Sequence, residues 1–182
     1  MDKVEILILR NLLYNEEYLR KVVPFIKAEY FEEITQKVIF EEIWNFVQEY
    51  NQATTKEVLC IEIEKRSDIT DASFKEITQL ISYLEDVPTD YDWLLDTTEK
   101  WCRDRAIYLA LMESIALADG KDKEKDRDAI PSILSDALAV SFDTHVGHDY
   151  LLDYEARYES YHRKEDKIEF DLEFFNKITK GG

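Results

Sequence analysis

The chain is poor in residues that interrupt or cross-link secondary structure. It contains four glycines, three prolines and two cysteines among 182 residues. The two interior glycines, Gly120 and Gly147, stand alone, whereas phosphate-binding and dinucleotide-binding loops need several closely spaced glycines. Neither kind of loop is therefore expected. Cys60 and Cys102 lie within apolar helical patterns, which favours two free thiols in a reducing compartment.

Long apolar runs and basic charge are scarce as well. No apolar run approaches the roughly 18–20 residues of a membrane-spanning helix, and the amino terminus lacks the features of a signal peptide. The chain has only 23 Lys and Arg residues against 40 Asp and Glu residues, and this excess of negative charge argues against a large nucleic-acid-binding surface. Hydrophobic residues at 45% exclude a disordered acidic chain. We expect a folded cytoplasmic protein whose partners are proteins with basic surfaces.

What the sequence does contain is helical periodicity. Glu, Lys, Leu, Ile and Ala are frequent, and sustained alternation of apolar and polar residues is rare. Asn15, Thr54 or Thr55, and Asp71 mark helix starts in the first part of the chain. The sequence predicts an all-α protein with a helical globular subdomain at residues 1–89.

A long helical hairpin is predicted at residues 90–143. Residues 90–118 contain no Gly or Pro, and residues 106–118 are apolar on almost every side, so this helix must be covered on more than one side. Residues 119–128 alternate in charge sign and are typical of a solvated tip, and Pro131 opens a second helix that continues to Phe142. The apolar residues of the long helix are predicted to form two stripes, Trp101, Tyr108, Leu109, Met112 and Ala116 on one side and Ile107, Leu111, Ile115 and Ala118 on the other.

The second helix of the hairpin can cover one stripe, so the other stripe needs a different neighbour. That neighbour is either the globular subdomain or another subunit, and the sequence favours neither. The residues predicted for an oligomer interface on the hairpin are Trp101, Ile107, Leu111, Ile115, Ile133, Leu134 and Leu138.

A short tyrosine-rich helix is predicted within residues 144–164. His145 and His148 mark a joint, and Asp149 caps the helix that follows. One interpretation is an ordinary amphipathic helix on its own domain. The other is a docking helix, because tyrosine suits half-wet interfaces. The residues predicted for docking are Tyr150, Leu151, Tyr154, Tyr158 and Tyr161.

Residue patterns for catalysis are weak. Cys102 lies on an apolar helix, where a thiol is usually inert. His145 and His148 have no cysteine nearby to complete a zinc site, and Glu159 with His162 matches only half of a di-iron bundle motif. We expect no catalytic, cofactor-binding or metal-binding residue. A helical metal enzyme based on Glu159 and His162 is an alternative that elemental analysis would test.

Several segments resemble a known family. They are AIPSILSDALAVSFDTHVGHDYLLDYEARYESY at residues 129–161, FFNKITKGG at residues 174–182, EYF at residues 29–31 and LISYLEDVPTDYDWLLDTTEK at residues 80–100. Together they closely resemble the replicative DNA helicases of T-even-type bacteriophages, which belong to the DnaB-like hexameric family. The resemblance covers nearly the whole chain, and SFDTHVGHD at residues 141–149 is its most specific part.

The resemblance implies an N-terminal collar domain, made of a globular part and a hairpin, followed by a linker helix at residues 144–164. Residues 165–182 would begin the connection to a RecA-like ATPase domain that this chain lacks. ATP and Mg are then expected only in the full-length helicase, which would be a hexamer that contacts DNA as a ring in the host cytoplasm. This chain would form a homo-oligomer, as a dimer or another form, and would dock primase and helicase loader.

A second interpretation is a stand-alone adaptor or inhibitor that mimics the collar of a replicative helicase. A reading frame that continues past Gly182 into a phosphate-binding loop would favour the collar, and a stop codon there would favour the adaptor.

Overall fold

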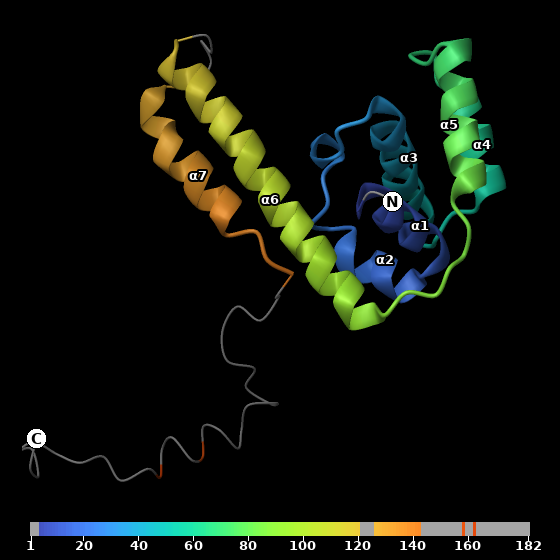
Figure 1. The fold of residues 1–182 in the computed structure, drawn as a ribbon, viewed down its shortest axis with the longest axis horizontal. Helices are drawn as coiled ribbons and strands as arrows, with labels where there is room; N and C mark the ends of the chain where they lie inside the picture. Colours follow the sequence, from blue (N-terminus) through green and yellow to red (C-terminus); the bar gives the residue numbers. More distant parts are fainter. Residues whose placement is uncertain (1–3, 121–125, 143–157, 159–161, 163–182) are drawn as a thin grey trace, which may run out of the picture. The chain divides into compact units, whose positions relative to one another are not determined.

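The computed structural model describes residues 4–120, 126–142, 158 and 162, and all regular elements among them are helices, which confirms the all-α prediction. Residues up to Phe142 form one compact unit (Figure 1), and residues 143–182 form a second. The elements of the first unit are α1 (Val4–Tyr14), α2 (Glu16–Val22), the 3-10 helix η1 (Ala28–Tyr30), α3 (Ile34–Tyr50), α4 (Lys56–Glu64), α5 (Asp71–Tyr83), α6 (Tyr91–Ala118), the 3-10 helix η2 (Arg127–Ala129) and α7 (Ile130–Leu138).

Short polar side chains begin α2, α4 and α6, as their positions in the sequence predict. The side chains of Asn15, Thr55 and Asp90 accept hydrogen bonds from backbone N–H groups three residues later. Each of these bonds satisfies a donor that the helix cannot pair internally. At the other end of α3, Asn51 adopts the left-handed conformation (φ 52°), which Asn tolerates better than most residues and which stops the helix.

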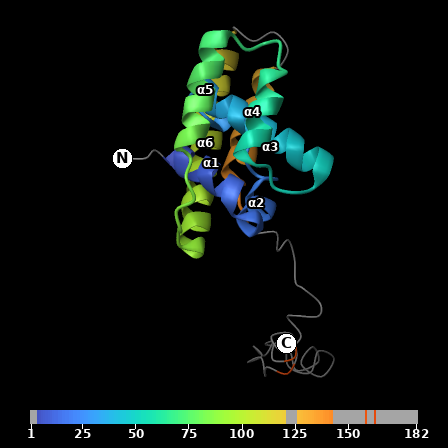
Figure 2. The same ribbon diagram turned by 90° about the vertical axis from the view of Figure 1, so that its right-hand side faces the viewer.

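The core of the first unit lies among α1 to α5 and the first half of α6. The second half of α6 pairs with α7, so that the two form a hairpin (Figures 1 and 2). The helices α4 and α5 pack on α3 and on each other. The largest fully buried side chains are Ile8, Leu9, Leu12, Tyr18, Leu19, Ile39, Ile43, Leu59, Ile63, Ile77, Ile81 and Leu84.

An aromatic cluster attaches α6 to the rest of the core. The ring centroid of Trp101 lies 5.1 Å from that of Phe31 and 6.0 Å from that of Tyr30. One turn later, Arg105 Nε donates to the backbone oxygen of Tyr30 (2.7 Å), and Arg105 Nη1 pairs with Glu32 (2.7 Å). The first half of α6 is thus fixed through both rings and charges.

The chain that leaves α7 is attached to α6 by a hydrogen bond and to the segment after α2 by a ring contact. Arg103 Nε donates to the backbone oxygen of Val140 (3.1 Å), and Phe142 stacks on Phe25 with 5.0 Å between ring centroids. The predicted second helix extends to Phe142, but α7 ends at Leu138. Ala139 still has helical backbone angles, and these two contacts hold the chain that follows it outside a helix.

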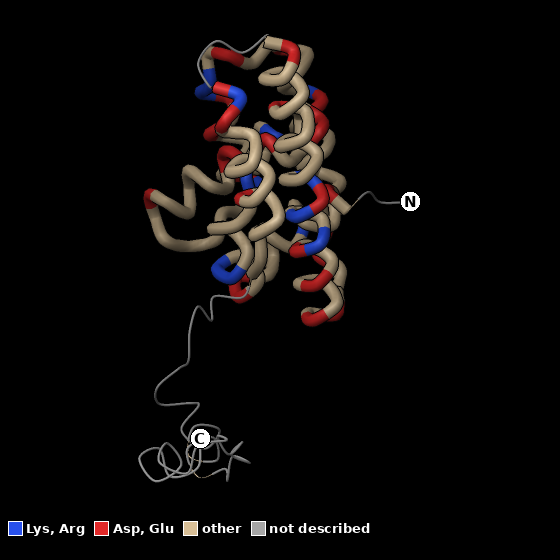
Figure 3. Tube along the Cα trace, turned by 90° about the vertical axis from the view of Figure 1, so that its left-hand side faces the viewer, with Lys and Arg blue, Asp and Glu red and all other residues tan. Residues whose placement is uncertain are grey.

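The surface of the described residues carries mostly negative charge. Acidic side chains are spread along the helices rather than gathered at one place (Figure 3). Arg66 bridges Glu41, Glu42 and Asp68 at 3.1, 2.9 and 2.7 Å, which ties α3 to the segment after α4. In the part of the chain that the structure describes, no helix is both long and apolar enough to cross a lipid bilayer.

A buried pair of hydroxyl groups joins α2 to α6. The hydroxyl of Thr98 donates to the backbone oxygen of Leu94 (2.7 Å), so it accepts from the hydroxyl of Tyr18 (2.7 Å). Both side chains are fully buried. Burial raises the pKa of Tyr18 well above its ordinary value, so this hydroxyl stays protonated and remains a donor.

We predict unequal costs for removing the two hydroxyls. Tyr18→Phe leaves Thr98 bonded to Leu94 and should lower the free energy of unfolding by about 1 kcal/mol. Thr98→Val leaves the buried Tyr18 hydroxyl without an acceptor and should lower the free energy of unfolding by about 2 kcal/mol. Urea unfolding of the two variants and of the double variant measures these values. Additive costs in the double variant would contradict a direct bond between the two groups.

Candidate functional site

The side of α6 that faces α7 is built from small residues. Cys102, Ala106, Ala110 and Ser114 recur every four residues and are all buried. The Ser114 hydroxyl donates to the backbone oxygen of Ala110 (2.7 Å), so its burial leaves no unpaired group. Small side chains let two helices approach closely. Leu109 of the first predicted stripe borders this seam as well, since it lines a hollow with Ile133 and Ala137 of α7.

The opposite side of the same half of α6 is apolar and exposed. The side chains of Tyr108, Leu111, Met112 and Ile115 are exposed to 52%, 47%, 52% and 56%, and we call these four residues the open face. Trp101 lies on the same side of the helix, seven residues before Tyr108, but there Tyr30 and Phe31 cover it. The open face therefore begins where the globular part stops covering α6.

The structure separates the residues predicted for the oligomer interface. Leu111 and Ile115 lie together on the open face, while Trp101 is buried in the core and so lies apart from them. Leu138 is exposed to 65% on α7. The remaining three, Ile107, Ile133 and Leu134, are half-buried and pack against the core. Sequence reasoning placed Tyr108 and Met112 on a stripe but left them out of the interface.

Arg105 holds the first residue of the open face in position. Its guanidinium lies 5.1 Å from the centroid of the Tyr108 ring, within the range of a cation–π interaction. The same guanidinium is fixed by Tyr30 and Glu32. The exposed Tyr108 ring is therefore held in position by a side chain that is itself fixed. Contiguous exposed apolar side chains of this kind mark interaction surfaces, and a helical face fits a second helix.

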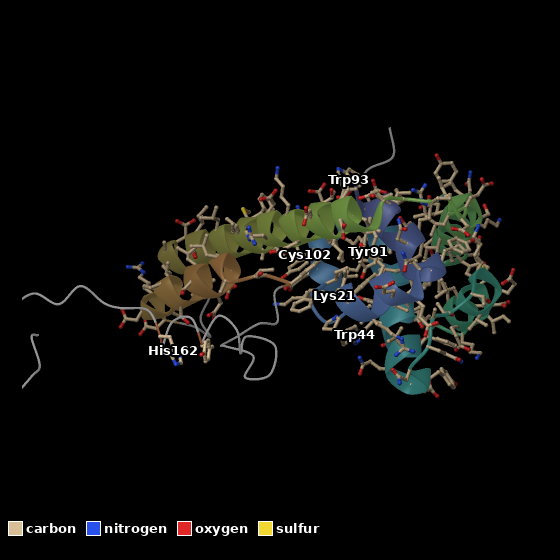
Figure 4. The ribbon with its side chains drawn as sticks, turned by 90° about the horizontal axis from the view of Figure 1, so that it is seen from below. Lys21, Trp44, Tyr91, Trp93, Cys102 and His162 are labelled. Atoms are coloured by element: carbon tan, nitrogen blue, oxygen red, sulfur yellow. The ribbon has the colours of Figure 1, made fainter. Side chains whose placement is uncertain are left out.

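The thiols in the described residues are poorly suited to nucleophilic catalysis. Cys102 is fully buried, and burial raises its pKa to about 12. Figure 4 shows it on the side of α6 opposite to the exposed Trp93. Cys60 is half-buried, and burial raises its pKa as well.

The histidine that the structure describes makes a local contact. One ring nitrogen of His162 lies 2.8 Å from the backbone oxygen of Tyr158. No group of three or more His, Cys, Asp or Glu side chains in the described part of the chain is placed to hold a metal ion. Glu159, His145 and His148 lie outside the described residues.

The predicted linker helix lies mostly beyond the described part of the chain. Tyr158 is described and is exposed to 64%, with its ring stacked 4.0 Å from that of His162. The docking role of this segment stays a prediction. The other four residues predicted for docking, Tyr150, Leu151, Tyr154 and Tyr161, lie outside the described residues.

The sequence of the chain is similar to that of a known protein. No family model matches the chain. Over 184 aligned positions the chain is 38% identical to a DnaB-like replicative helicase of Enterobacteria phage T4. The chain is related to this phage helicase. The alignment covers 97% of the chain, as the resemblance in sequence predicted, but only 38% of the length of the DnaB-like replicative helicase.

We predict that the two thiols differ in reactivity. In the native protein at mildly alkaline pH, Cys60 should react slowly with a disulfide reagent, and Cys102 should stay unmodified until the protein unfolds. A Cys60→Ser variant should then show no thiol that reacts in the native protein. One thiol, Cys102, should react after denaturant is added. Rapid labelling of Cys102 in native Cys60→Ser protein would contradict the buried position of the thiol, with Cys102→Ser as the matched control.

Proposed function

We propose that this chain is the non-catalytic collar of a hexameric replicative DNA helicase and that it serves ring assembly. The relationship to a DnaB-like replicative helicase supports the general role. The observation that carries the proposal is the open face, which lies on the half of α6 that the globular part leaves uncovered. An apolar helical face in that place suits pairing with a second copy of the chain.

ATP-driven unwinding would belong to the rest of the helicase. The chain spans 38% of the length of its relative, so the larger part of the helicase lies outside it. In this proposal ATP and Mg act only in the full-length protein, and DNA contacts the full-length ring. The collar would also dock primase and helicase loader, and residues 144–164 would dock on a neighbouring subunit.

The size of the open face predicts weak association. Each of its four side chains is about half exposed, so covering one gains on the order of 1 kcal/mol, or about 8 kcal/mol for two copies. Association costs roughly 4–15 kcal/mol in lost freedom of motion. Pairing through this face alone should therefore depend on protein concentration, and a stable ring needs contacts from the rest of the helicase.

We predict that Leu111→Asp with Ile115→Asp reduces self-association. Two carboxylates in the pairing surface would have to be desolvated, which opposes contact. Light scattering coupled to size exclusion, over a wide range of concentration, should show the wild-type chain growing in mass and the double variant remaining a monomer.

The matched control is Ile61→Asp with Val87→Asp, because these side chains are exposed to 53% and 45% on other elements. The control should associate like the wild type. Circular dichroism confirms that the variants stay folded. A wild-type chain that is monomeric at every concentration, or a double variant that associates normally, would refute the proposal.

A further inference from the structure

A pocket lies between α3 and the segment that follows α2. Its volume is about 560 Å³, and its apolar lining includes Ile26, Phe40 and Trp44. We call it the α3 pocket. Ile26 and Phe40 are buried, whereas Trp44 is half-buried and stays partly accessible. Cavities of this volume hold drug-sized ligands, so the α3 pocket has room for a few side chains rather than for a whole helix.

One wall of the α3 pocket carries more negative than positive charge. Arg66 Nη1 donates to Glu41 Oε2 (3.1 Å) and to Glu42 Oε1 (2.9 Å), and these three residues line the pocket. The same guanidinium also pairs with Asp68 through Nη2 (2.7 Å). Three carboxylates therefore share one cation, so their negative charge is only partly neutralised.

Each of the two glutamates keeps one oxygen that a partner can use. Arg66 bonds to one oxygen of each carboxylate, and a carboxylate can accept hydrogen bonds at both of its oxygens. The other two, Glu41 Oε1 and Glu42 Oε2, are bonded to no described residue and are not buried. A planar group with several N–H donors can bind across two such oxygens.

The lysines near the α3 pocket do not cancel this excess. Lys27 lines the pocket, but its ammonium lies 3.7 Å from Glu29, so these two side chains together carry no net charge. Lys37, one helical turn before Glu41, does not line the pocket. The pocket thus combines an aromatic side chain, apolar walls and unneutralised carboxylates, which is a combination that favours an organic cation.

We propose that the α3 pocket binds an arginine side chain of a partner protein together with the apolar residue next to it. The guanidinium would lie against Trp44 and donate to Glu41 and Glu42. The neighbouring apolar side chain would contact Ile26 and Phe40. The α3 pocket shares no residue with the open face, so this inference goes beyond the collar role and does not depend on it.

The probe is a fluorescently labelled peptide of about eight residues, with Arg beside Leu at its centre and Gly and Ser elsewhere. Fluorescence anisotropy with the full chain should show saturable binding with a Kd below about 1 mM. Replacing the arginine of the probe by citrulline, which has nearly the same shape but no charge, should weaken binding about tenfold. This comparison leaves the protein unchanged, so it cannot be confused with a loss of folding.

Two substitutions in the chain test the two contacts of the guanidinium. Trp44→Leu keeps an apolar side chain but removes the ring, and it should weaken binding about threefold. Glu41→Gln removes one negative charge while Glu42 and Asp68 still hold Arg66, and it should weaken binding about fivefold.

The matched controls make the same two changes at exposed positions outside the α3 pocket. Trp93→Leu and Glu85→Gln should each change the affinity by less than about twofold, since distant exposed charges are screened. Leu111→Asp with Ile115→Asp should bind the probe like the wild type, which separates the pocket from self-association. Circular dichroism checks the fold of each variant.

Three results would overturn the proposal. They are the absence of saturable binding to the wild type, equal binding of the citrulline probe, and equal effects of the pocket variants and their controls. Light scattering tests a different occupant. Self-association that is weakened by Trp44→Leu would place a second copy of the chain in the pocket, and the proposed partner would then be wrong.

Discussion

The packing of Trp101 against Tyr30 and Phe31 determines which part of α6 is covered and which part is exposed. With Arg105 bonded to the backbone of Tyr30, this contact fixes the first half of the helix to the globular part. Beyond Arg105 the globular part no longer covers that side, and α7 covers the small-residue side instead. The open face is thus left without a cover inside its own unit. The contact that stabilises the core therefore also decides where α6 becomes exposed.

The fold was predictable because the signals that set it are local. Asn15, Thr55 and Asp90 each begin a helix through a bond to a residue three positions away, and sparse Gly and Pro leave α6 uninterrupted. The end of α7 was not predictable in the same way. It depends on Phe142 reaching Phe25, and on Arg103 reaching Val140, and such pairings are decided by the tertiary structure.

The candidate site was predicted in part. Leu111 and Ile115 were predicted to lie opposite to Tyr108 and Met112, but all four lie on the open face. The predicted stripe that joins Trp101 to Tyr108 also combines a buried residue with an exposed one. Helical periodicity gives the direction of a side chain and not the length of helix that a neighbour covers. The seam had a readable signal, since Cys102, Ala106 and Ala110 recur every four residues. Larger apolar residues interleave with these small ones along α6, so composition alone does not reveal the seam.

The aromatic cluster fixes the first half of α6, and the second half extends from it as a hairpin with α7. From Trp101 to Ala118 the helix rises roughly 26 Å, at about 1.5 Å per residue. A tilt of about 10° at the aromatic cluster would therefore carry the tip of the hairpin through roughly 4–5 Å. Small changes of packing around Tyr30 and Phe31 would therefore appear as larger displacements at the far end of the hairpin.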